Sequence, residues 1–216
     1  MVFTRTRRDG QETRERLLRA GLELFTANGF LGTTTPALAT RAGIAEGTIY
    51  RHFGSKEALL NAVYAESQRW LLRLLREADG DRGLSAPGRL SRFAHRVLAV
   101  AAADPAQVRM ALLPRDTGFL DVTSQEASRE FHEALQHVVA MGKSDGQVRA
   151  GPADLWAAVW LAVLTFTAER VSSGEWTPEQ SHAALAIDAA WEVIAVRPAA
   201  ATITPRSPQL PSLPSK

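Results

Sequence analysis

Hydrophobic residues recur at helical spacing through most of this sequence, and that periodicity strongly restricts the folds open to the chain. In residues 12–28, five small or apolar residues lie on one face of a helix: Leu17, Leu18, Gly21, Leu24 and Phe25. No segment alternates between apolar and polar residues as a half-buried strand does. We therefore expect an all-α fold of roughly nine helices.

Turn and capping signals divide the periodic sequence into segments. The expected helices are 12–28, 36–42, 45–53, 56–78, 89–103, 105–113, 124–142, 153–173 and 178–196. Proline follows an expected helix start at Asp104-Pro105, Gly151-Pro152 and Thr177-Pro178. Three capping boxes are predicted, pairing Asp9 with Glu12, Thr123 with Glu126, and Thr177 with Gln180. Gly29, Gly43 and Gly54 are expected to end helices.

The composition is that of a soluble globular protein, with 45% apolar and 22% charged residues. The absence of cysteine excludes disulfides, Cys-ligated zinc and a thiol nucleophile. We find neither a secretory signal nor a run of about 18 apolar residues, so we expect a cytoplasmic protein with no membrane partner.

Basic charge is concentrated in the N-terminal third of the chain. Residues 1–76 hold 12 Lys and Arg against 7 Asp and Glu, whereas residues 77–216 hold 13 against 16. This imbalance points to a polyanionic partner, although an uneven scatter of solvated charges would look the same. Arg5, Arg7 and Arg8 form a basic arm that either reaches a DNA groove or is a frayed terminus.

The segment GIAEGTIYRHFGSKEALL, residues 43–60, joins a tight turn to a very short helix rich in polar and aromatic residues. With the preceding helix it has the lengths and central glycine of a helix-turn-helix. Leu38, Ala42 and Ile49 can pack the two helices together. These side chains are left for the outer face, where hydroxyl, phenol, imidazole and cationic groups can donate to phosphate oxygens: Thr35, Arg41, Glu46, Gly47, Thr48, Tyr50, Arg51 and His52. Lys56 can add a phosphate contact at the start of the next helix.

These residues resemble the DNA-binding domain of the TetR family of bacterial transcriptional regulators. The pattern is G-F-x-x-T-T followed by L-A-x-R-A-G-I-x-x-G-T-I-Y-x-H-F-x-S-K-E-x-L, from Gly29 through Thr33 and Thr34 to the leucines after Lys56. It lies within a resemblance that covers about 50 residues. The resemblance implies an all-helical homodimer that binds a palindromic operator, usually as a repressor. It also implies phosphate contacts from Thr33, Tyr50, His52 and Lys56. By the same resemblance, base edges are read at these positions: Thr35, Glu46, Gly47 and Thr48.

Two residues depart from the family pattern. Ala45 stands where the family often has serine, so a side-chain cap on the second helix of the motif is lost. Glu46 places an acidic group at the groove. It either accepts a hydrogen bond from cytosine N4 or repels phosphates and is compensated by Arg41 and Arg51.

The C-terminal two-thirds contain no sharp motif. Aromatic and sulfur-containing residues could line a pocket for an apolar or aromatic effector, or could simply fill the core: Trp70, Phe93, His95, Met110, Phe119, Phe131, His132, Trp156 and Trp160. We interpret the last two helices as a dimer seam rather than monomeric core, with these candidate contacts: Val159, Val163, Phe166, Ile187, Trp191 and Ile194.

Nothing in the sequence supports an enzyme, a metal site or a cofactor. GKSDG at 142–146 matches G-x-S-x-G, but it follows a predicted helix rather than the strand that a nucleophile elbow requires. His132 and His137 are five residues apart and do not share a helix face well enough for a metal pair.

The predicted organisation is a basic flexible arm (1–10), a helix-turn-helix domain (11–57), a helical ligand-binding and dimerisation domain (58–197) and a disordered Pro-rich tail (198–216). The predicted function is a sequence-specific transcriptional regulator, a repressor released from its operator by a small-molecule effector. The alternative is a ligand-binding or scaffold protein whose motif no longer reads DNA sequence.

Overall fold

The computed structural model describes residues 3–78, 83–113 and 118–197, with side chains from Asp9 onward. These residues form nine α-helices and no β-strand beyond one isolated bridge between Val148 and Ala195. The helices are α1 (Phe3–Gly32), α2 (Thr35–Ala42), α3 (Gly47–Phe53), α4 (Lys56–Glu77), α5 (Ala86–Ala103), α6 (Pro105–Ala111), α7 (Val122–Ser144), α8 (Ala153–Ser172) and α9 (Ser181–Ile194). The all-α expectation is confirmed. The predicted tail at 198–216 lies outside the described residues.

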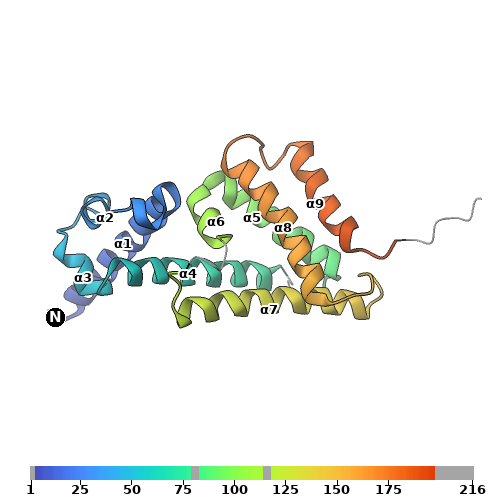
Figure 1. The fold of residues 1–216 in the computed structure, drawn as a ribbon, viewed down its shortest axis with the longest axis horizontal. Helices are drawn as coiled ribbons and strands as arrows, with labels where there is room; N and C mark the ends of the chain where they lie inside the picture. The colour runs from blue at the N-terminus through green and yellow to red at the C-terminus, as the bar shows by residue number, and fades with distance from the viewer. Residues whose placement is uncertain (1–2, 79–82, 114–117, 198–216) are drawn as a thin grey trace, which may run out of the picture.

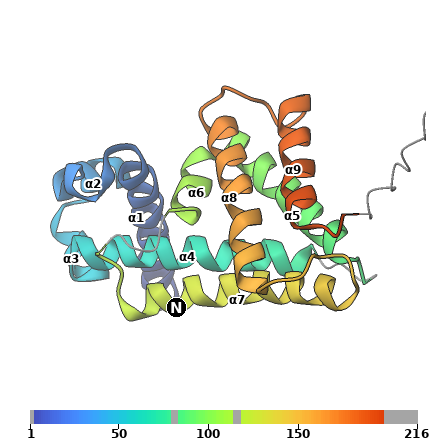
Figure 2. The ribbon, with the colours of Figure 1, turned by 45° about the vertical axis from the view of Figure 1, so that its right-hand side comes forward.

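Helix α4 is a long central helix that packs against both the N-terminal helices and the C-terminal body (Figure 1). Helices α1, α2 and α3 gather around its N-terminal end, and α5 and α6 pack against it further along. Helix α8 packs on α5 and α7, and α9 packs on α8, beyond the end of α4 in Figure 1. Helix α7 runs beside α4 in both ribbon views, and α8 rises from it (Figure 2). Helix α1 and the helix-turn-helix motif, α2 and α3, therefore project from one end of a larger helical body.

Two hydrophobic cores meet along α4. The first combines Leu17, Leu38 and Ile49 with Leu59 and Tyr64 from the start of α4. The second begins further along the same helix and contains Leu71 and Leu75, together with residues from α5, α7, α8 and α9. Met110 of α6 is buried in the first core although its helix belongs to the second body. The predicted boundary at residue 57/58 thus falls before the residues of α4 that pack with the motif.

Several predicted helix boundaries are wrong. Residues 3–10, expected as a flexible arm, are the first turns of α1. Thr13 Oγ1 donates to the Asp9 carbonyl within that helix, so Asp9 is not its N-cap. The cap of α7 is Asp121, whose carboxylate accepts from the Ser124 N–H, and not Thr123. Helix α9 begins at Ser181, one turn later than the sequence indicates.

Helix α8 is long and apolar enough to cross a membrane by length and composition alone. The core helix of a soluble protein meets the same two criteria. Its residues Trp160, Leu164 and Ala168 are buried in the second core, and the helix packs against α5, α7 and α9. This packing accounts for its apolar character.

We expect Gly29→Ala and Gly10→Ala to change stability in opposite directions. Gly29 interrupts α1 with φ 71° and ψ 172°, a conformation that costs any other residue about 1–3 kcal/mol. Gly10 lies inside α1 with nothing within 4 Å of the place a β-carbon would take, so alanine there should stabilise by about 0.5–1 kcal/mol. Chemical denaturation measures both changes, and a stabilising Gly29→Ala would contradict the kink.

Candidate nucleic-acid interface

Helices α2 and α3 form a helix-turn-helix whose inner face is fully packed. Thr34 caps α2 by accepting from the Ala37 N–H, and Gly43 ends the helix in the left-handed conformation at φ 66°. Leu38 and Ile49 have no exposed surface. Burial of these residues fixes α3 against the domain and leaves its opposite face in solvent, as the sequence predicted.

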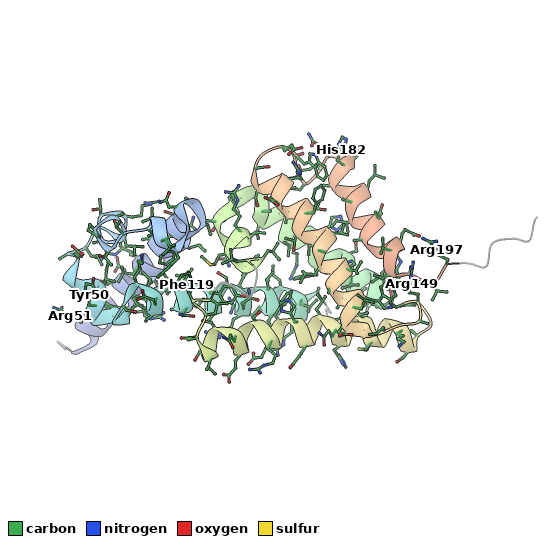
Figure 3. All side chains as sticks on the ribbon, in the orientation of Figure 1. Tyr50, Arg51, Phe119, Arg149, His182 and Arg197 are labelled. Carbon is green, nitrogen blue, oxygen red and sulfur yellow. The ribbon has the colours of Figure 1, made fainter. Side chains whose placement is uncertain are left out.

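The outer face of α3 is polar and exposed at one extreme end of the molecule. Tyr50 is 50% exposed, and Arg51 is exposed beside it. Both lie at the tip of the motif, far from the C-terminal helices (Figure 3). Gly47 is exposed with open space where a β-carbon would stand, while Thr48 and His52 are partly buried. This surface presents the Tyr50 phenol, the Arg51 guanidinium and the exposed backbone at Gly47 to a large partner.

Glu46 is held by the helix that precedes it. Thr35 Oγ1 donates to Glu46 Oε1 at 2.8 Å, which ties the start of α2 to the start of α3. Glu46 makes no capping bond of its own to α3, so that helix begins without a side-chain cap, as Ala45 led us to expect. The carboxylate is therefore already oriented before any partner binds.

Two of the predicted phosphate contacts, Thr33 and Lys56, make structural contacts in the free protein. Thr33 is 1% exposed, and its hydroxyl donates to the carbonyls of Leu24 and Gly29. The Lys56 ammonium donates to the carbonyls of Phe30 and Thr33 at 3.0 and 2.9 Å. It also lies 4.2 Å from the centre of the Phe30 ring. These contacts fasten the end of α1 to the start of α4.

The N-terminus of α4 is well capped. Ser55 Oγ accepts from the Ala58 N–H at 3.1 Å. The pKa of the Glu57 carboxyl is lowered because the carboxylate accepts hydrogen bonds from its own backbone N–H and from the Ser55 side chain. An ionised Glu57 in the first turn complements the helix dipole.

A chain of ion pairs leads from α6 to the motif. Asp104, the N-cap of α6, accepts from Arg19 of α1 at 2.5 Å, and Arg19 also pairs with Glu23 at 2.6 Å. Glu23 in turn pairs with Arg41 of α2. The hydrogen bond to Asp104 is the main reason that the pKa of Arg19 is raised. Arg41, predicted as a DNA contact, is thus held by Glu23 in the free protein.

The predicted pocket residues are divided among several places. Met110 and Phe119 line a cavity of about 570 Å³ between the end of α1 and α6, and Phe131 and His132 line another of about 230 Å³. The remaining five pack elsewhere: Phe93 and Trp160 lie against each other in the core, Trp70 borders the core, Trp156 lies beneath Arg149, and His95 is exposed.

The predicted dimer residues differ in how far they are exposed. Ile187 and Ile194 are 4% and 0% exposed and belong to the core of the protomer, so they are not free to contact a partner. Val159, Val163 and Trp191 are half-buried against that core. Phe166 is 46% exposed. The outward faces of α8 and α9 carry other apolar residues that the sequence did not single out: Leu155, Leu185, Val193 and, just beyond α9, Val196.

The sequence did not lead us to expect structural roles for Asn61 and Gln68 of α4, although both are almost fully buried. Asn61 donates to the Phe119 carbonyl and accepts from the Asp121 N–H, so it pins the entry to α7. Gln68 donates to the Ala111 carbonyl. The signal was present in the sequence, because positions 61, 68 and 75 repeat every seven residues and Leu75 lies on the core face.

An exposed helix-turn-helix on an all-helical body is the arrangement of helix-turn-helix DNA-binding proteins, and it places this protein in that class. Within the described residues, no group of three or more His, Asp or Glu side chains is placed to hold a metal ion. The sequence GKSDG closes the last turn of α7 and the turn after it, which is not the strand-to-helix setting of a nucleophile elbow.

Residues 17–63 match the family model described as bacterial regulatory proteins, tetR family. The chain is 41% identical over 69 residues to the HTH-type transcriptional regulator UidR of Escherichia coli K12, a match covering 32% of this chain and 35% of UidR. The chain thus spans about a third of the length of this curated relative.

The whole fold is also shared with solved structures. A TetR family transcription regulator from Marinobacter aquaeolei VT8 matches with a TM-score of 0.76 and 22% identity, covering 88% of this chain and all of the other. A TetR-like regulator from Rhodococcus sp. RHA1 matches with a TM-score of 0.67 and 25% identity over 84% and 94% of the two chains. Residues 17–63 thus match the TetR family model, and most of the chain shares the fold of these solved TetR-family regulators.

We expect Lys56→Met to destabilise the protein without any DNA present. The substitution removes two hydrogen bonds, which leaves the Thr33 carbonyl without the ammonium donor and the Phe30 carbonyl with only the Thr33 N–H, at a cost of about 1–3 kcal/mol. Arg51→Met, an equal loss of charge on an exposed side chain, should change stability by no more than about 0.5 kcal/mol. Urea unfolding measures the free energy of unfolding of both variants. Equally small losses would show that the Lys56 hydrogen bonds do not stabilise the fold.

Proposed function

We propose that this protein regulates transcription by binding a palindromic operator as a homodimer, as a cytoplasmic repressor that a small-molecule effector releases. The observation that carries the proposal is the exposed polar face of α3 on an otherwise packed motif. Tyr50 and Arg51 lie at one end of the molecule, far from the C-terminal helices (Figure 3). Side chains of this kind donate to phosphate oxygens.

The proposed DNA contacts divide by role. Thr34, Tyr50, Arg51 and His52 contact phosphates, and Arg41 joins them if it leaves Glu23. Thr35, Glu46, Gly47 and Thr48 lie near base edges. The hydrogen bond from Thr35 to Glu46 orients that carboxylate, which favours its use as an acceptor for cytosine N4.

The proposed dimer interface is the outward face of α8 and α9. Leu155 and Phe166 on α8 are 48% and 46% exposed, and Leu185 and Val193 on α9 are 65% and 40% exposed. Exposed alanines between them would allow two such faces to approach closely. A shared apolar face of this kind is rarely left in solvent by a monomer. Its two-fold pairing would give the two α3 helices a fixed separation, which operator binding requires.

Effector release requires a link between the helical body and the motif, and α6 provides one. Its N-cap Asp104 joins the ion pairs that reach Arg41, and its Met110 is buried in the core of the motif. A ligand that moves α6 would therefore move α1 and α2. A protein of the same fold, FadR from Bacillus subtilis, has been solved in complex with stearoyl-CoA, at 18% identity.

We expect Arg51→Ala to weaken DNA binding and reduce its salt dependence, because one phosphate contact is lost. On a random-sequence duplex, the slope of log affinity against log salt should fall by about 1 in magnitude per half-site. Arg92→Ala removes another exposed arginine, from α5, and should leave the slope unchanged. Fluorescence anisotropy across a salt series measures both.

Equal slopes for the wild-type protein and the Arg51→Ala variant would contradict α3 as the DNA-binding surface. A slope that falls for Arg92→Ala instead would move the DNA contact to the helical body.

We expect Leu185→Glu to produce a monomer. A carboxylate at the proposed two-fold interface would be buried without a partner, which weakens self-association by at least about tenfold. Leu31→Glu is the matched control, because Leu31 is 82% exposed on α1, away from α8 and α9. Analytical ultracentrifugation distinguishes the two variants. A dimeric Leu185→Glu variant would show that the interface lies elsewhere.

A further inference from the structure

A cavity of about 230 Å³ lies between α4, α7 and α8, at the end of α6. Its walls are mostly apolar and include Leu112, Leu161 and Phe131. Three polar side chains also line it, namely Gln68 from α4, His132 from α7 and Thr165 from α8. An engineered apolar cavity of about 150 Å³ is large enough for benzene, so this one has room for a small aromatic molecule.

Gln68 brings an unsatisfied acceptor to this cavity. The side chain is 1% exposed, and one end of its amide lies 2.8 Å from the Ala111 carbonyl. A carbonyl can only accept, so that end is the NH₂ group and the other is the oxygen Oε1. Gln68 Oε1 has no hydrogen-bond partner within the described part of the chain. A buried acceptor in this state costs free energy until a donor reaches it.

His132 adds a second acceptor. Its Nδ1 lies 2.7 Å from the Ser128 carbonyl, so Nδ1 carries the proton and donates. In the neutral imidazole the other nitrogen, Nε2, accepts. The polar side chains that line the cavity thus carry two acceptors and one hydroxyl. Together with the apolar walls, these groups offer an uncharged ligand both apolar contact and hydrogen bonds.

We propose that this cavity binds a small uncharged aromatic molecule carrying a hydroxyl or N–H group, such as a phenol, which donates to Gln68 Oε1. The assignment rests on the proposed effector-responsive function and names the chemistry of the effector. The aromatic ring fills the space between the leucines and Phe131, and the donor satisfies the orphaned oxygen.

The same amide connects the ligand to the motif. Gln68 donates to the carbonyl of Ala111, the last residue of α6. A donor on Oε1 polarises the amide and strengthens its bond to that carbonyl. Because the other end of α6 is joined to α1 through Asp104 and Arg19, occupation of the cavity acts on the helix that contacts both bodies.

The test compares phenol with toluene, which has nearly the same shape and lacks the donor. Binding is measured by NMR titration of the whole chain without DNA, so the result is independent of operator binding. In a cavity without an acceptor, toluene binds better because its methyl group has no hydration to lose. We expect phenol to bind about tenfold more tightly than toluene.

We expect the preference for phenol to disappear in Gln68→Met and to persist in Gln125→Met. Gln125 is the matched control, because its amide also donates to a backbone carbonyl, that of Leu120, but on the exposed side of α7. If Gln68→Met does not fold, the Gln68 side-chain amide resonance of the wild-type protein supplies the same information. It should shift with phenol and not with toluene.

Three results would overturn the proposal: no binding of either compound, toluene binding as tightly as phenol, or a phenol preference that survives Gln68→Met. None of them bears on whether α3 binds DNA. Conversely, loss of DNA binding in every assay would leave a measured phenol preference intact, so the two proposals fail separately.

Discussion

Helix α4 contributes to both hydrophobic cores, and this sharing makes the orientation of the motif depend on the helical body. Leu59 and Tyr64 pack with α1 and the motif, whereas Leu71 and Leu75 pack with the remaining helices. Because packed cores resist continuous deformation, the helix transmits a shift rather than absorbing it. Met110 of α6 reaches into the first core and adds a second connection.

Two buried polar side chains on α4 also fix the positions of the segments that pack against it. Asn61 fixes the segment that enters α7, and Gln68 fixes the end of α6. Both side chains use backbone carbonyls or N–H groups that helix ends leave unpaired. Surface ion pairs such as Arg19 with Asp104 contribute little stability by themselves, yet they orient α6 relative to α1.

The fold and the outer face of α3 were predictable from sequence, because helical periodicity and the Gly43 turn are local signals. The structural contacts of Thr33 and Lys56 were not predictable, because their partners, the carbonyls at the end of α1, are brought close only by tertiary packing. Ile187 and Ile194 failed for a related reason. Periodicity shows that a helix has an apolar face, and it does not tell whether its own chain or a second copy covers that face.

The most direct test of the account is selection of duplexes from a random DNA pool by the purified protein at one stated salt concentration. The account predicts enrichment of an inverted repeat whose half-sites lie about one helical turn apart, since two α3 helices related by a two-fold axis would read it. No enrichment by protein shown to be folded and dimeric would contradict sequence-specific regulation.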